Sequence, residues 1–138
     1  MEIIKIIALI VFWAVLLWAA LYDWKHRIIP DTASVLTAVS GFLILQSPID
    51  SLIGSLAGGG LLFVMAMINP NWVGGGDIKL LAGIGTAFGW SVLWVLWIAC
   101  LIGLIFLWIS RKKSLPFAPF LFGGTIIVSL VTLGGMVI

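Results

Sequence analysis

The side chains best suited to acid–base chemistry in this sequence are three aspartates, Asp23, Asp31 and Asp77. They are among only five acidic residues in 138, and each lies at the edge of a long apolar stretch. No histidine, serine or cysteine stands out as their partner, which favours hydrolysis by a pair of carboxylates. In such a pair an ionised carboxylate activates water while a protonated one polarises a carbonyl group. Carboxylates held close together cannot both ionise, so two of them can divide these roles.

Each of these aspartates also has a structural interpretation. Asp31 follows a proline and precedes an apolar run, which is the position of a helix N-cap, and Asp77 is placed to cap the next apolar segment in the same way. Asp23 ends an apolar segment, where an acidic side chain opposes the helix dipole. Its structural role would therefore be an ion pair with Lys25 or Arg27.

Three glycines, Gly74, Gly75 and Gly76, come directly before Asp77. Residues without a Cβ reach backbone angles that other residues cannot, and they let an extended peptide lie against the chain. A proteolytic site within a membrane must unwind its helical substrate and supply partners for the exposed backbone. The glycines are therefore predicted to support substrate binding.

The composition indicates a membrane protein. Hydrophobic residues make up 63% of the chain and charged residues only 9%, whereas a soluble domain carries about 25% charged residues. The mean hydropathy is +1.31. The net charge of +2 gives no reason to expect a nucleic acid partner, and the single cysteine excludes an intrachain disulfide and a CxxC metal site. We predict one transmembrane peptidase domain over residues 1–138, with no metal or cofactor.

The apolar stretches cover residues 3–22, 32–45, 52–68, 78–109 and 117–138. The fourth is ambiguous, because as one helix it would be about 48 Å long at 1.5 Å per residue, against a hydrocarbon core of about 30 Å. The pair Gly89-Trp90 is a reasonable turn that would divide it into two helices, the first of them short.

The placement of basic residues favours that division. They gather at 25–27 and at 111–113, and Lys and Arg concentrate in cytoplasmic loops. If the chain crosses the membrane twice between Asp77 and the second basic cluster, both basic clusters lie on the same side of the membrane. Asp23, Asp31 and Asp77 then lie on that side too. The sequence thus predicts an all-α integral membrane protein, a bundle of six transmembrane helices with a short fourth helix. It would be a multi-pass protein of the cytoplasmic (inner) membrane, with both termini outside.

Three stretches of this sequence resemble the signatures of a known family. Gly74–Asp77 is similar to the GxGD signature of intramembrane aspartyl proteases, and the following Lys79 and apolar helix resemble the type IV prepilin peptidases. "YDWKHRIIPD", residues 22–31, resembles their aspartate followed by a basic stretch and Ile-Pro-Asp or Ile-Pro-Asn. "LPFAPFL", with Pro116 and Pro119, resembles the segment that opens their last helix. The three matches occur in family order over nearly the whole chain.

This resemblance implies that Asp23 and Asp77 are the catalytic pair. It implies cleavage of the short basic leader of pilin-like precursors on the cytoplasmic side, just before their apolar helix, with the precursor and the bilayer as partners. Around the pair, the supporting or substrate-binding residues would be Gly74, Gly75, Gly76, Lys79, Asp31, Pro116 and Pro119.

Longer members of that family begin with an extra cytoplasmic domain and also N-methylate the new N-terminus. Here the first aspartate of the pair comes at residue 23, so the chain resembles the short preflagellin and Flp-type peptidases. A presenilin-like protease would need about nine spans. A small transporter or channel subunit would use the aspartates to bind protons or cations, and would place them at the midplane of broken helices. A purely structural membrane subunit is a further alternative.

The helix dipoles also predict how the pair shares a proton. Asp23 ends a helix, where partial negative charge disfavours its ionised form, whereas Asp77 begins one, where partial positive charge favours the carboxylate. We therefore predict that Asp23 holds the proton and that Asp77 activates water.

Overall fold

The computed structural model describes residues 2–26, 28–45, 47–69, 75–110 and 118–135. Within these residues it contains six α-helices and one short 3-10 helix, and no strand, so the all-α prediction is confirmed there. In order they are α1 (Glu2–His26), α2 (Asp31–Leu45), α3 (Pro48–Ile68), α4 (Gly75–Phe88), the 3-10 helix η1 (Gly89–Ser91), α5 (Val92–Ser110) and α6 (Ala118–Gly135).

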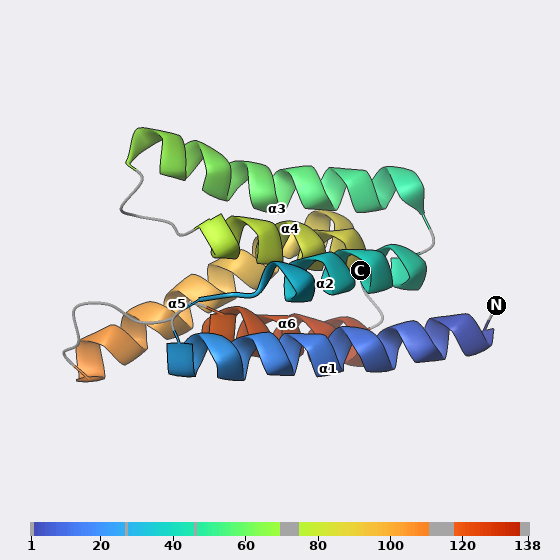
Figure 1. The fold of residues 1–138 in the computed structure, drawn as a ribbon, viewed down its shortest axis with the longest axis horizontal. Coiled ribbons are helices and arrows are strands. Elements are labelled where there is room, and N and C mark those ends of the chain that lie inside the picture. Colours follow the sequence, from blue (N-terminus) through green and yellow to red (C-terminus); the bar gives the residue numbers. More distant parts are fainter. Residues whose placement is uncertain (1, 27, 46, 70–74, 111–117, 136–138) are drawn as a thin grey trace.

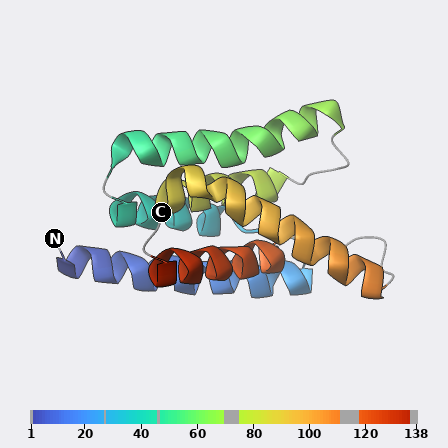
Figure 2. The same ribbon diagram turned by 180° about the vertical axis from the view of Figure 1, so that it is seen from behind.

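The helices form two packed groups. In one, α4 packs chiefly against α2 and α3; in the other, α6 packs against α1 and α5, and the contact of α1 with α2 joins the groups. Figure 1 shows α3 along one side, α4 and α2 in the middle, and α1 and α6 along the other side. Seen from behind in Figure 2, α5 crosses the bundle diagonally.

Gly89 divides the long apolar stretch as predicted. Its φ of 59° lies in the left-handed region that favours glycine, and it opens η1, after which α5 runs back along the bundle (Figure 1). The prediction of a turn at Gly89-Trp90 and a short helix before it is confirmed. The ends of α1, α3 and α5 and the starts of α4 and α6 lie toward the left of Figure 1, and α2 begins nearer the middle.

Three helical stretches in the described residues are long and apolar enough to cross a membrane: Ile3–His26, Pro48–Ile68 and Gly75–Ser110. The last contains both α4 and α5, and two shorter apolar helices, Asp31–Leu45 and Ala118–Val131, accompany them. Six transmembrane spans therefore stay a prediction. The outward faces carry many large apolar side chains, which suits contact with lipid rather than water.

Close packing and partly buried hydrogen bonds hold α4 in place. Gly54 of α3 and Gly85 of α4 approach so closely that a Cβ on either would collide with the backbone of the other. The Ser51 hydroxyl donates to the Thr86 carbonyl at 2.8 Å, and the Thr86 hydroxyl lies 3.0 Å from the carbonyl oxygen of Ala38 in α2. These contacts fix the helix that carries Asp77.

Candidate active site

A cavity of about 270 Å³ lies at the end of the bundle where α1 ends and α4 begins, and we call it the aspartate cavity. It is lined by Asp23, Ile28, Ile29, Asp31, Gly75, Gly76 and Asp77. The structure thus brings together two aspartates and two glycines from opposite halves of the sequence, with Asp31 beside them. Of the other predicted site residues, Lys79 and Pro119 lie nearby in α4 and α6, and Gly74 and Pro116 lie outside the described residues.

Asp23 is buried in the last turn of α1, with 4% of its surface exposed. Its Oδ2 accepts a hydrogen bond of 2.9 Å from the backbone N–H of Ala118, the first residue of α6. A helix N-terminus offers free N–H groups and partial positive charge to an anion. The start of α6 therefore holds the Asp23 carboxylate in position.

The contact between Asp23 and Ala118 bears on the proton assignment. The N–H of Ala118 stabilises an ionised Asp23, whereas the dipole of α1 alone predicted a protonated one. Two helix ends with opposite partial charge thus meet at Asp23, so the argument from the dipole of α1 is incomplete.

Asp77 is the third residue of α4, partly buried, and it follows Gly75 and Gly76 at the start of that helix. Because α4 begins at Gly75, Asp77 lies within the first turn rather than at the N-cap. Our explanation of the glycines by unusual backbone angles was wrong for Gly75 and Gly76. Both are helical, and among the described glycines only Gly89 has a positive φ.

Gly75 and Gly76 matter instead because they lack a side chain. A Cβ at Gly76 would lie 3.0 Å from the Cβ of Ile29, closer than side chains normally approach, whereas nothing lies within 4 Å of a Cβ at Gly75. Gly76 therefore lets α4 approach the segment after α1, which brings Asp77 to the same cavity as Asp23. Gly75 leaves the edge of the cavity open.

Asp31 and Lys79 form an exposed ion pair beside the cavity, with 3.1 Å between Lys79 Nζ and Asp31 Oδ1. Asp31 is the first residue of α2, and the carbonyl of Pro30 accepts from the N–H of Ala33 and, at 3.4 Å, from that of Ser34. Pro30 thus occupies the cap position, and the interpretation of Asp31 as the N-cap was wrong. The partner of Lys79 across the helices is Asp31.

The arrangement suits hydrolysis by two carboxylates. Asp23 and Asp77 come from different helices and line a space large enough for several waters, each of which takes about 30 Å³ in the liquid. Among the described residues, no group of three His, Cys, Asp or Glu side chains is placed to hold a metal ion. Independently of that, two carboxyl groups at one cavity can act as a general acid and a general base.

The residue that sequence reasoning missed is Ala118. It lies between the two prolines of "LPFAPFL", and those prolines were predicted to support the site. This segment contains the donor, but the sequence does not show which backbone N–H will meet a carboxylate. Pro119, partly buried as the second residue of α6, fits the first turn of a helix because its missing N–H would have no partner there.

Comparison with known proteins gives two matches. Residues 10–108, which include both Asp23 and Asp77, match the family model described as the type IV leader peptidase family. The prepilin leader peptidase/N-methyltransferase of Bacillus subtilis (strain 168) is 35% identical in an alignment 136 residues long. The alignment covers 88% of this chain and 54% of that protein. The chain thus spans about half the length of this curated relative. No solved structure matches.

Proposed function

We propose that this chain, which belongs to the type IV leader peptidase family, is an aspartic endopeptidase with Asp23 and Asp77 as its catalytic residues. Its apolar helices and its family make it a multi-pass membrane protein. The observation that carries the proposal is the aspartate cavity, because it unites two carboxylates that are far apart in the sequence. A shared cavity is what a water-activating dyad requires.

The proposed substrates are pilin-like precursors, cleaved between a basic leader and an apolar helix. The B. subtilis relative is named a prepilin leader peptidase, which supports this substrate class. The aspartate cavity adjoins the end of α1, where Lys25 and His26 lie in the last turn. Basic residues at that end favour the cytoplasmic side, which is the side where the resemblance implies leader cleavage.

The proposed reaction needs one proton shared between the two carboxyl groups. Water attacks the scissile carbonyl carbon and gives a proton to the ionised carboxylate, while the protonated carboxyl group donates its proton to the carbonyl oxygen. When the tetrahedral diol collapses, the C–N bond breaks and the leaving nitrogen takes the proton that came from water. The diol returns the other proton to the second carboxylate, so the pair regains its starting state.

Cleavage of a co-expressed pilin-like precursor tests this proposal. Asp23→Asn and Asp77→Asn should each lower the cleavage rate by roughly 10²- to 10⁴-fold, the usual contribution of a general acid or base. Asp50→Asn is the matched control, since Asp50 is an exposed aspartate in the first turn of α3, at the opposite end of the bundle. Substantial cleavage by Asp77→Asn at normal protein levels would refute the assignment.

No observation favours the transporter or channel alternative. That alternative expects the carboxylates at the middle of the membrane, whereas the aspartate cavity lies at one end of the bundle. Asp77→Glu adds a direct test. A cation site often tolerates the longer carboxylate, whereas a dyad that positions water should lose activity.

A further inference from the structure

We propose that a groove between α2 and α3 binds the part of the precursor that directly follows the scissile bond. The groove has a volume of about 420 Å³ and is called here the α2–α3 groove. Asp31, Ser34, Val35 and Ala38 of α2 form one wall, and Ser55 of α3 contributes to the other. The inference rests on the proposed peptidase function and extends it to a second binding site.

Small residues of α4 form the floor of this groove. Both α2 and α3 pack chiefly on α4 rather than on each other, so α4 is accessible between them. Ala82 and Gly83 line the groove there. A Cβ at Gly83 would lie 3.0 Å from the carbonyl oxygen of Ser34, so α2 lies as close to α4 as a glycine permits. Ala82 and Gly83 therefore leave the floor of the groove without a bulky side chain.

The groove adjoins the aspartate cavity. Asp31 lines both spaces, and its ion-pair partner Lys79 lines the groove. Both side chains are well exposed, at 76% for Asp31 and 59% for Lys79. Exposed ion pairs resist separation only weakly, so a peptide can displace this one. A chain that crosses the aspartate cavity can therefore pass directly into the groove.

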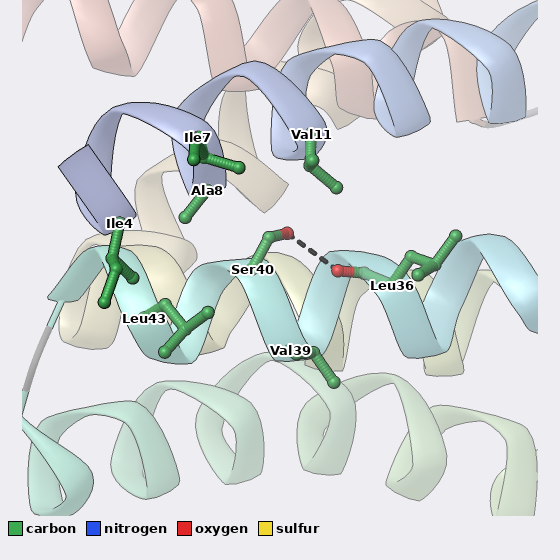
Figure 3. A pocket seen from close by; sticks show the side chains of 8 residues that line it. All are labelled: Ile4, Ile7, Ala8, Val11, Leu36, Val39, Ser40 and Leu43. Carbon is green, nitrogen blue, oxygen red and sulfur yellow. Dashed lines mark hydrogen bonds between the residues drawn. The ribbon is translucent and has the colours of Figure 1, made fainter.

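Ser34 indicates a peptide rather than a lipid chain. It is 7% exposed, and its hydroxyl oxygen has no hydrogen-bond partner in the structure. By contrast, Ser40 in the apolar pocket between α1 and α2 donates to the carbonyl of Leu36 at 2.7 Å (Figure 3). An unwound peptide carries backbone N–H and C=O groups that need partners inside a membrane. Ser34 lines the groove although its hydroxyl oxygen is covered. A bound peptide that turns this side chain outward can supply the missing partner, whereas an acyl chain cannot.

The length of the groove sets the number of residues it holds. Asp31 to Ala38 spans about 10 Å along α2 at 1.5 Å per residue, which matches about three residues of extended peptide at 3.3 Å each. Val35, Ala38 and Ala82 make the groove apolar beyond its mouth. The proposed occupant is therefore the first few apolar residues after the scissile bond.

A bulky side chain in the groove tests the proposal. Val35 is 61% exposed, so Val35→Trp fills the groove without disturbing the core. The matched control is Leu36→Trp, because Leu36 lies at the same depth of α2 but lines the separate pocket against α1 (Figure 3). Two probes are compared: a model precursor with a basic leader and an apolar helix, and a peptide that ends one residue after the scissile bond.

We expect Val35→Trp to lower kcat/KM for the long precursor by about tenfold or more. The kcat/KM for the truncated peptide should not change, because only the long precursor reaches the groove. Leu36→Trp should cleave both probes like the wild type. Equal cleavage of the long precursor by the two tryptophan variants would overturn the groove proposal while leaving the peptidase intact. If the wild type cleaves neither probe, the proposed function itself fails.

A crosslinking experiment tests whether the precursor lies in the α2–α3 groove without introducing a bulky side chain. In the inactive Asp77→Asn protein with Cys100→Ser, we expect Val35→Cys to form a disulfide with a precursor that carries a cysteine two residues after the scissile bond. Leu36→Cys in the same background should not. Equal crosslinking from both positions would overturn the proposal.

Discussion

The hydrogen bond from Ala118 to Asp23 predicts that removal of a single backbone N–H impairs catalysis. The bond is 2.9 Å long and its acceptor is 4% exposed, so water cannot readily replace the donor. A hydrogen bond to a charged group contributes about 1.5–3 kcal/mol. At about 1.4 kcal/mol for each tenfold change, loss of this bond corresponds to a roughly 10- to 150-fold lower cleavage rate.

The cleanest perturbation replaces Ala118 by lactic acid through nonsense suppression, which exchanges the N–H for an ester oxygen and keeps the methyl group. We expect kcat to fall while KM changes little, because Asp23 acts on the reacting atoms rather than on binding. Ala118→Pro removes the same donor by ordinary mutagenesis. Proline is tolerated at the first residue of a helix, which is the position of Ala118 in α6.

The control is Ala118→Gly, which keeps the N–H but removes a methyl group that is 1% exposed. It should lose some thermal stability in detergent and retain most of its activity per folded molecule. Equal loss of activity in the glycine and lactic acid variants would refute the reasoning, since the effect would then come from packing. Unchanged activity in the lactic acid variant would show that Asp23 does not depend on this donor.

Three further predictions follow from the structure and the topology. In the six-span arrangement a reporter fused at Asp50 reads external, and a cytoplasmic reading would contradict that arrangement. The N–H of Ala118 stabilises an ionised Asp23, so Asp77 should hold the proton. The infrared band of the protonated carboxyl group at neutral pH should then vanish in Asp77→Asn and persist in Asp23→Asn. The opposite result would support the assignment from the dipole of α1. Gly85→Ala should destabilise the protein by about 1–3 kcal/mol through overpacking, measured by unfolding in detergent, whereas Gly60→Ala, with nothing within 4 Å of its Cβ, should not.

The helices could be predicted from the sequence because several signals agreed. Apolar runs marked them, the basic clusters at 25–27 and 111–113 fixed which ends belong together, and Gly89 marked the break in the longest run. The meeting of Asp23 with Asp77 at one cavity followed from the same reasoning. In each case the information lies in the type and position of side chains, which a sequence displays directly.

The contacts that could not be predicted depend on tertiary packing. Every residue except proline has a backbone N–H, so only the approach of α6 to α1 selects the N–H of Ala118 for Asp23. The ion pair of Asp31 with Lys79 likewise depends on the crossing of α2 and α4. Gly76 was identified as important for the wrong reason, because its need for space against Ile29 appears only when both segments are placed.

The candidate catalytic aspartates belong to different packed groups of helices. Asp77 is carried by α4, which α2 and α3 hold, whereas Asp23 is carried by α1 and held by the start of α6. Contacts between α4 and α6 are few compared with those inside each group, whereas α1 packs extensively against α2. The two groups therefore form one bundle, and the aspartate cavity lies at its end. The α2–α3 groove lies wholly within the first group, on the helix that carries Asp77. A precursor bound there would be held next to the helix that carries Asp77, with Asp23 lining the same cavity.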